Sequence, residues 1–386
     1  MKTALVFSGG GARGAYQIGA WKALNELDMH FDIVTGTSIG SINGAMYVLG
    51  ELDLAQKMWQ NLNFKSVFAE DFNYTSSKDH KEVVKKYLKS IRKGGLSPNN
   101  LKDNLIKCID INAFYKSKID YGLTTVSYPK FKPIKKVRKD IPKEELIDYI
   151  VASSTVFPVF KVQEISDKKY VDGGFKDPVP IDLAIDMGAE KMVVINIGYF
   201  KRRTKIDKKI LDQYDVTVIK PNNSIGTPLT FDAKNAIKIM KYGYNDTMKV
   251  FGKLYGKSYT FKSILKDYNK NSYFKNEKSY ITTIEYLGKL LKLDDTKIYD
   301  VEDFKTQIIT KFNDVEYKDI KRVKSFKRRL NNVEKIRYFY NHINKETKLI
   351  DKLSKQYKKE YLSACYLYYN SKEGETKNER NNWKAN

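Results

Sequence analysis

A short stretch near the N-terminus holds a serine in a setting typical of enzyme nucleophiles. In a nucleophile elbow a strand turns sharply into a helix, glycines stand where side chains would clash, and the serine hydroxyl lies near the positive end of the helix. Ordinary glycine-rich turns also match this five-residue form, so it does not establish a nucleophile by itself. The stretch reads Gly36, Thr37, Ser38, Ile39 and Gly40, which is Gly-x-Ser-x-Gly.

A glycine-rich loop precedes this serine. Consecutive glycines let backbone N–H groups approach a small anionic atom, and a helix opening at the end of the loop adds its dipole. We therefore predict an oxyanion hole, with Arg13 bracing the loop or adding positive charge; a plain glycine-rich turn is the alternative. The predicted oxyanion-hole residues are Gly9, Gly10, Gly11, Arg13 and Gly14.

The loop also has the spacing of the dinucleotide-binding fingerprint, with glycines at positions 9, 11 and 14. In that fingerprint an acidic residue follows a second strand about 20 residues further on. Here the second strand ends in the serine elbow instead. No Gly-Lys-Ser/Thr follows the loop either, so it is not a P-loop. Neither nucleotide-binding interpretation is favoured.

A carboxylate completes the set of reactive groups. A short strand ends at Asp172, directly before Gly173 and Gly174. This arrangement exposes a side chain at the edge of a site, although an aspartate followed by glycine also caps ordinary turns. A serine nucleophile needs a group that takes its proton. Asp172 is the candidate for that role.

Histidine is too scarce to make the usual triad convincing. The chain has three histidines, His30, His80 and His342, and only His342 follows Asp172. We therefore predict a dyad of Ser38 and Asp172, with the carboxylate as direct base. A free aspartate has a pKa of about 3.9 and is a weak base, but burial raises that pKa and improves the match.

Apolar periodicity predicts the elements that must hold these groups. The order of strand, glycine loop, helix, strand, elbow and helix is the start of a parallel α/β sheet. After about residue 257 the chain becomes rich in Lys and Tyr and mostly helical in pattern. We expect strands over residues 3–7, 31–34, 121–128, 169–172, 191–197 and 216–220, and helices over residues 15–27, 39–49, 53–61, 99–109, 143–152, 180–187 and 231–253.

The 386 residues carry a net charge of +24, and 41% of them are hydrophobic. This composition is globular. The positive charge favours a polyanion such as an anionic membrane surface or nucleic acid. Basic stretches at residues 201–209, expected to be an exposed loop, and 321–329 contain no recognisable nucleic-acid motif, so no nucleic-acid partner is expected.

Cysteine usage and hydropathy bear on location. Two cysteines rule out a disulfide framework and fit a reducing compartment. No apolar run is long enough for a membrane span, and the N-terminal apolar run is too short for a signal peptide. We therefore expect a cytoplasmic protein that associates peripherally with membranes; secretion without a cleavable signal is also compatible. No metal-ligand spacing is present, so no metal is expected.

Taken together, these motifs resemble the patatin-like phospholipases, in their bacterial branch. The likeness extends to about residue 250. It rests on three spaced motifs in the right order, and on the turn at residues 188–191. The matching residues are Gly9 to Gly14, Gly36 to Gly40, Ala152, Ser153 and Ser154 with Pro158, and Asp172, Gly173 and Gly174 with Pro180.

The resemblance implies a three-layer α/β/α sandwich, which we expect over residues 1–255. Residues 256–386 are expected from their own pattern to be mainly helical and are only loosely similar to the helical extensions of some bacterial members. The resemblance also implies a lipid acyl hydrolase that acts on phospholipids or other acyl-ester lipids through Ser38 and Asp172, with no metal or cofactor. An acyltransferase or thioesterase would use the same acyl-enzyme, and a basic nucleic-acid-binding protein is a third alternative. The sequence carries no prediction of oligomeric state.

Overall fold

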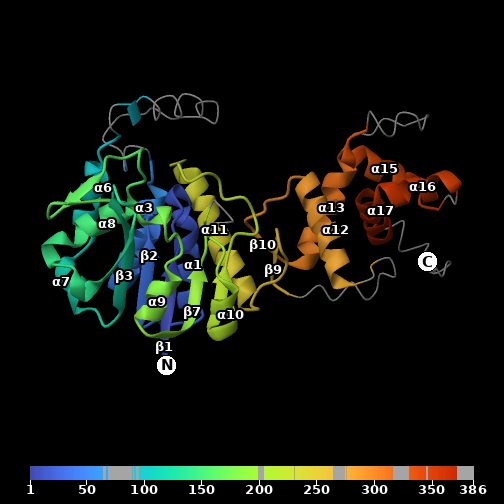
Figure 1. The fold of residues 1–386 in the computed structure, drawn as a ribbon. Helices are drawn as coiled ribbons and strands as arrows, with labels where there is room; N and C mark the ends of the chain where they lie inside the picture. Colours follow the sequence, from blue (N-terminus) through green and yellow to red (C-terminus); the bar gives the residue numbers. More distant parts are fainter. Residues whose placement is uncertain are drawn as a thin grey trace. The chain divides into compact units, whose positions relative to one another are not determined.

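The fold is described from a computed structural model of the chain (Figure 1). The residues that it describes are 1–63, 67, 89, 91–92, 95–198, 204–229, 231–263, 274, 276–315, 330–344 and 347–371. The chain forms two compact units, Met1–Val250 and Phe251–Asn386. The basic stretch at residues 321–329 lies outside the described residues.

The first unit is built on one mixed sheet whose strand order is β5-β6-β3-β2-β1-β7-β8, with β4 paired to β3. Strands β3, β2, β1, β7 and β8 are parallel, whereas β4 and β6 run antiparallel to β3. The strands are β1 (Lys2–Phe7), β2 (Ile33–Thr37), β3 (Asp120–Tyr128), β4 (Pro133–Val137), β5 (Gln163–Ile165), β6 (Lys168–Asp172), β7 (Ala189–Ile195) and β8 (Asp215–Ile219).

Helices flank this sheet, so the predicted mixed α/β class is confirmed (Figure 1). The helix expected over residues 39–49 is α2, and the glycine loop ends in the 3-10 helix η1 (Gly11–Gly14). The α-helices of this unit are α1 (Ala15–Glu26), α2 (Ile39–Leu49), α3 (Leu52–Gln60), α6 (Asn99–Cys108), α7 (Ile111–Lys116), α8 (Leu146–Ser154), α9 (Ile181–Asp186), α10 (Lys208–Gln213) and α11 (Ala233–Val250).

Side-chain alternation along the strands divides these helices between the two faces of the sheet. Ala4 and Val6 of β1 belong to a buried cluster with α9. Phe7 faces the other way and its ring packs against Tyr47 of α2 at 6.3 Å between centroids. Because successive side chains of a strand point to opposite faces, α9 and α2 cover opposite faces of the sheet. This is the layering that a three-layer sandwich requires.

The register of the central strands brings three connections to one edge of the sheet. Phe7, the last residue of β1, pairs with Gly36 of β2, so the glycine loop and the elbow leave the sheet side by side. Thr37 pairs with Thr124 of β3, and the next residue of β3 pairs with Asp172 at the end of β6. The predicted reactive residues therefore meet at the carboxyl edge of the parallel strands, where ligands of open α/β sheets bind.

The second unit has its own aromatic core. Its largest buried side chains include Phe261, Tyr280 and Phe304. Besides the expected helices, this unit contains a short parallel pair of strands. These strands were not predicted, because two residues are too few to show a periodicity. The elements are β9 (Thr260–Phe261), α12 (Glu277–Leu290), β10 (Ile298–Tyr299), α13 (Val301–Asn313), α15 (Asn332–His342), α16 (Lys348–Gln356) and α17 (Lys358–Asn370).

One local expectation was wrong in part. Residues 201–209 were expected to form an exposed loop, but α10 begins at Lys208. Asp207 caps this helix, because its side chain accepts a hydrogen bond from the Lys209 N–H. Residues 204–207 are irregular, and residues 201–203 lie outside the part of the chain that the structure describes. No helix of the described residues combines the length and the hydropathy needed to cross a bilayer.

Candidate active site

Ser38 sits at the turn between β2 and α2 in a strained backbone conformation. Its φ is 56° and its ψ is −131°, a region that non-glycine residues seldom adopt. The two elbow glycines are needed here, because a Cβ at Gly36 would collide with the carbonyl of Gly40, and a Cβ at Gly40 with the carbonyl of Phe7. Ser38 is also the N-cap residue of α2, so its side chain lies at the positive end of that helix.

Neighbouring serines hold the strained turn in place. The Ser38 N–H donates to Ser153 Oγ at 2.9 Å, and Ser153 Oγ in turn donates to the Thr124 carbonyl of β3 at 2.8 Å. Ser41 Oγ donates to the Ser38 carbonyl at 2.7 Å. Ser153 is fully buried, so its two bonds tie the elbow to α8 and to the sheet. No role in holding the elbow was predicted for Ser153 from the sequence.

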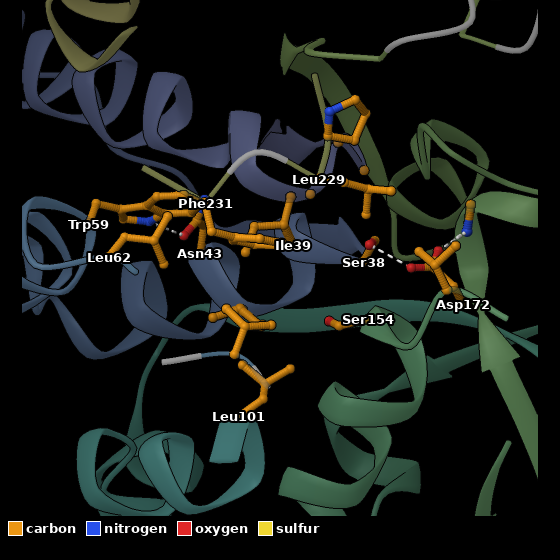
Figure 2. Close-up of a pocket in the computed structure, with 18 of the residues that line it drawn as sticks. Ser38, Ile39, Asn43, Trp59, Leu62, Leu101, Ser154, Asp172, Leu229 and Phe231 are labelled. Carbon is orange, nitrogen blue, oxygen red and sulfur yellow. Dashed lines mark hydrogen bonds between the residues drawn. The ribbon is translucent and has the colours of Figure 1, made fainter. Parts of the chain in front are cut away.

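Asp172 faces the serine directly. Ser38 Oγ donates to Asp172 Oδ2 at 2.6 Å, and the second carboxylate oxygen accepts the Gly174 N–H at 2.7 Å (Figure 2). The Asp172 N–H donates to the Thr155 carbonyl at 3.1 Å, which fixes the backbone as well. Both carboxylate oxygens therefore have a donor, and Oδ2 is the one aimed at the serine.

Burial sets the basicity of this carboxylate. Asp172 is 3% exposed, and desolvation raises its pKa from 3.8 to about 6, against the opposing effect of its hydrogen bonds to Ser38 and Gly174. The charged form is disfavoured because it has left water for an apolar interior. A pKa near 6 makes the group a better proton acceptor than a free aspartate, and it is still ionised above that pH.

The glycine loop lies against the serine, but only part of it can donate to an oxyanion. The Gly9 N–H is already bonded to the Pro178 carbonyl at 2.9 Å. Gly9 instead gives close approach, since a Cβ there would lie 3.3 Å from Ser38 Cβ. For the N–H groups of Gly10 and Gly11 no acceptor is recorded among the described residues, and both residues line the cavity beside Ser38.

The other two predicted loop residues have supporting positions. Gly14 lets α1 approach closely, because a Cβ there would press against Ile39 and the Trp59 ring. Arg13 lies within η1, and its N–H donates to the Gly10 carbonyl at 3.3 Å. Neither residue lines the cavity. Of the five predicted residues, Gly10 and Gly11 thus lie at the cavity with N–H groups that could donate, and Gly9, Arg13 and Gly14 shape the loop.

A cavity of about 510 Å³ opens from the Ser38–Asp172 pair. Its wall beyond Ser38 is largely apolar and comes from α2, α3, α6 and the residues around Phe160 and Phe231 (Figure 2). The polar groups of Asn43 in this wall are used internally, since Asn43 accepts from Trp59 Nε1 at 3.2 Å and donates to Gln17 Oε1 at 2.8 Å. The wall is thus suited to an apolar chain. These lining residues carry no sequence motif and were not predicted.

Neither of the two described histidines, His30 and His342, takes part in this site. His30 is exposed and lies 3.1 Å from Asp28, and His342 belongs to the second unit, where its ring stacks on Tyr338. His80 lies outside the described residues. Within the described part of the chain, no three His, Cys, Asp or Glu side chains gather as a metal site requires.

Comparison with known proteins gives a consistent result. Residues 5–185 match the family described as patatin-like phospholipase, a range that contains the elbow, the glycine loop and Asp172. Patatin-like phospholipase domain-containing protein 6 of Homo sapiens is 28% identical over 207 residues, which cover 50% of this chain and 13% of that protein. Lysophospholipase nte1 of Aspergillus terreus is 58% identical over 43 residues, 11% of this chain and 3% of that protein.

The chain thus spans only a small part of the length of these curated relatives. Among solved structures, VipD from Legionella pneumophila superposes with a TM-score of 0.42 at 14% identity, over 96% of this chain and 90% of that one.

Proposed function

We propose, from the premise that residues 5–185 are a patatin-like phospholipase domain, that this chain is a serine lipid acyl hydrolase of the phospholipase A type. It would cleave fatty-acyl esters of phospholipids through an acyl-enzyme on Ser38. The observation that carries the proposal is the 2.6 Å hydrogen bond from Ser38 Oγ to a buried carboxylate, at the opening of an apolar cavity. A capping aspartate in an ordinary turn would have no need of such a cavity.

In the first half of the reaction, Ser38 Oγ attacks the ester carbonyl carbon and its proton passes to Asp172 Oδ2. The carbonyl oxygen becomes an oxyanion, which the N–H groups of Gly10 and Gly11 are proposed to bind; one such donor is worth about 2.7–4 kcal/mol of transition-state stabilisation. When the tetrahedral intermediate collapses, the C–O bond of the ester breaks. Asp172 returns the proton to the leaving alkoxide, so the lyso-lipid departs as an alcohol.

In the second half, water attacks the acyl-enzyme carbonyl while Asp172 takes its proton. Collapse of the second intermediate breaks the bond to Ser38 Oγ, which regains a proton, and releases the fatty acid. An alcohol acceptor in place of water would give an acyltransferase by the same steps, and a thioester donor would give a thioesterase. The proposed chemistry uses only the side chains and backbone groups of the chain and needs no metal.

The shape and lining of the cavity favour binding of the acyl chain of a lipid substrate. Its apolar wall offers dispersion contacts and excludes water from the acyl chain, while the polar headgroup would remain at the opening near Asp172.

A reducing, cytoplasmic setting is proposed because both cysteines, Cys108 and Cys365, are free thiols. The first unit is proposed as the hydrolase domain.

A labelling experiment tests the nucleophile, and a product assay tests the substrate. The full chain is treated with a fluorescent fluorophosphonate and, separately, with phospholipid vesicles of several headgroups. We expect wild type to be labelled and to release fatty acid, and we expect Ser38→Ala and Asp172→Asn to do neither at comparable rates. Ser117→Ala is a matched control, because Ser117 does not line the cavity and its Oγ donates to the backbone carbonyl of Val48. Equal labelling or release by Ser38→Ala would refute the proposal.

A further inference from the structure

Exposed apolar side chains surround the opening of the cavity. Val156 and Leu229 line the cavity, yet they are 38% and 37% exposed, so they lie where it meets solvent. Leu229 is drawn close to Ser38 and Asp172 in Figure 2. Phe175, which follows the Gly174 turn, also lines the cavity and is half-buried. Exposed apolar side chains that lie together at one opening, rather than scattered over the surface, are typical of an interaction site.

Aromatic rings continue this apolar edge away from the opening. The Phe175 ring lies 6.0 Å from that of Phe131, which lies 5.7 Å from Tyr128, which in turn lies 5.5 Å from Phe157. Tyr128 is the last residue of β3, and Phe131 belongs to the turn between β3 and β4. Because β3 runs past the level of Asp172, this turn stands beyond the carboxyl edge of the sheet on the same side as the active site.

Lysines flank the aromatic rings at this turn. Lys130 and Lys132 stand on either side of Phe131, and Lys176 follows Phe175; all three are exposed. No ion pair is recorded for them among the described residues. These three exposed lysines therefore bring positive charge to the aromatic turn.

We propose that these apolar and basic residues, here called the docking rim, bind the first unit to the surface of an anionic phospholipid bilayer, with the cavity opening towards the lipid. The docking rim comprises the apolar residues Tyr128, Phe131, Val156, Phe157, Phe175 and Leu229 together with Lys130, Lys132 and Lys176. Aromatic rings favour the boundary between headgroups and acyl chains, and lysines bind anionic headgroups. The proposal deepens, and rests on, the proposed lipid hydrolase function, since docking would bring an ester bond to Ser38.

Two triple variants with the same change in charge test the docking rim. The rim variant is Lys130→Gln, Lys132→Gln and Lys176→Gln. The control variant is Lys116→Gln, Lys118→Gln and Lys139→Gln, exposed lysines at the opposite end of β3 and β4. Binding of the full chain is measured by sedimentation with diether phosphatidylglycerol–phosphatidylcholine vesicles, which carry no acyl ester bond, at low and at high salt.

Wild type and the control variant are expected to sediment with the anionic vesicles at low salt. The rim variant should bind roughly 100-fold more weakly, at about fivefold for each lysine lost. Phe131→Asn, at a position whose φ of 51° asparagine tolerates, should weaken binding as well. Equal binding of the rim and control variants, or no vesicle binding by wild type, would overturn the docking rim.

Turnover of a soluble short-chain ester, p-nitrophenyl butyrate, separates this result from a failure of the proposed function. None of the substituted residues lines the cavity, so all variants should hydrolyse the soluble ester as wild type does. If wild type neither hydrolyses this ester nor reacts with fluorophosphonate, the hydrolase proposal is wrong. If hydrolysis is intact and the rim variant still binds vesicles normally, only the docking rim is wrong.

Discussion

Replacing Asp172 with asparagine should stabilise the folded protein at neutral pH while abolishing its activity. Burial raises the pKa of Asp172 from 3.8 to about 6, so its charged form is less favourable in the folded state than in the unfolded chain. A change of one pKa unit corresponds to about 1.36 kcal/mol. The difference of about two units therefore predicts a cost of about 3 kcal/mol, and asparagine has no charge to bury.

The sign of the effect fixes its dependence on pH. Below pH 3.8 Asp172 is protonated in both states and the cost is absent. Between pH 3.8 and about 6 the unfolded chain loses this proton while the folded protein keeps it, so the stability of wild type falls as pH rises. Above pH 6 the cost is complete. The free energy of unfolding of Asp172→Asn minus that of wild type should thus grow by about 2.5 kcal/mol between pH 4 and pH 8, because a small part of the cost is already present at pH 4.

Asparagine at position 172 can form hydrogen bonds with both partners of the present carboxylate. Its oxygen can accept the Gly174 N–H, as Asp172 Oδ1 does now, and its amide can donate to Ser38 Oγ. The serine would then have no acceptor for its proton. Turnover should fall at least about a hundredfold, because a general base contributes roughly a hundredfold to ten-thousandfold to the rate.

Tryptophan fluorescence during urea denaturation can measure this difference. Trp21 and Trp59 are buried in the first unit, and a Trp383→Phe background removes the remaining tryptophan. Asp212→Asn is the control, because Asp212 is an exposed carboxylate of α10. If the stability difference between Asp172→Asn and wild type were the same at pH 4 and pH 8, Asp172 would not titrate with a raised pKa. The case for a carboxylate base would then fail.

Four further predictions concern the same site. In wild type, kcat/KM for a soluble ester should rise with pH to a plateau with a midpoint at about 6, because Asp172 must be ionised to accept a proton. Ser153→Ala should cost about 1–3 kcal/mol of stability and lower kcat, since the buried N–H of the elbow loses its acceptor; chemical denaturation and ester assays measure both. Gly11→Ala should lower kcat at least hundredfold, because Gly11 has a φ of 57° and a Cβ there meets the Pro228 carbonyl. Gly50→Ala is the control: Gly50 has a φ of 75° in open space, so the change should lower the free energy of unfolding by about 1 kcal/mol and leave turnover unchanged. Ala55→Leu should narrow the cavity and reduce turnover of long-chain esters more than of butyrate esters, which a chain-length series would show.

The local elements around the site could be predicted because they depend on short stretches of sequence. The helix over residues 39–49 follows from small and apolar residues after the elbow. The strand predicted over residues 3–7, which the structure has as Lys2–Phe7, follows from an apolar run that ends at the glycine loop. The elbow glycines are required by contacts within and beside the turn itself. For such features a few neighbouring residues carry nearly all of the determining interactions.

The partner of each backbone donor could not be predicted in the same way. Ser38 and Asp172 are 134 positions apart, and their 2.6 Å contact depends on the register between β3 and β6. Gly9 was predicted as an oxyanion donor, but the Pro178 carbonyl comes from a distant part of the chain and accepts its N–H. Ser153 was missed because its bonds cross from α8 to the elbow and to β3. Tertiary register decides these pairings, and periodicity does not contain it.

The energetic cost concentrated in the Ser38–Asp172 pair is itself support for a catalytic role. Ser38 holds a positive φ that costs about 1–3 kcal/mol in a non-glycine residue. Asp172 adds the burial cost of its charge, and both residues are directed at the same cavity. A turn with only a structural role would be more stable with glycine at position 38 and an uncharged side chain at position 172. The surrounding bonds from Ser41, Ser153 and Gly174 instead hold the costly arrangement in place, as a preorganised nucleophile and base require.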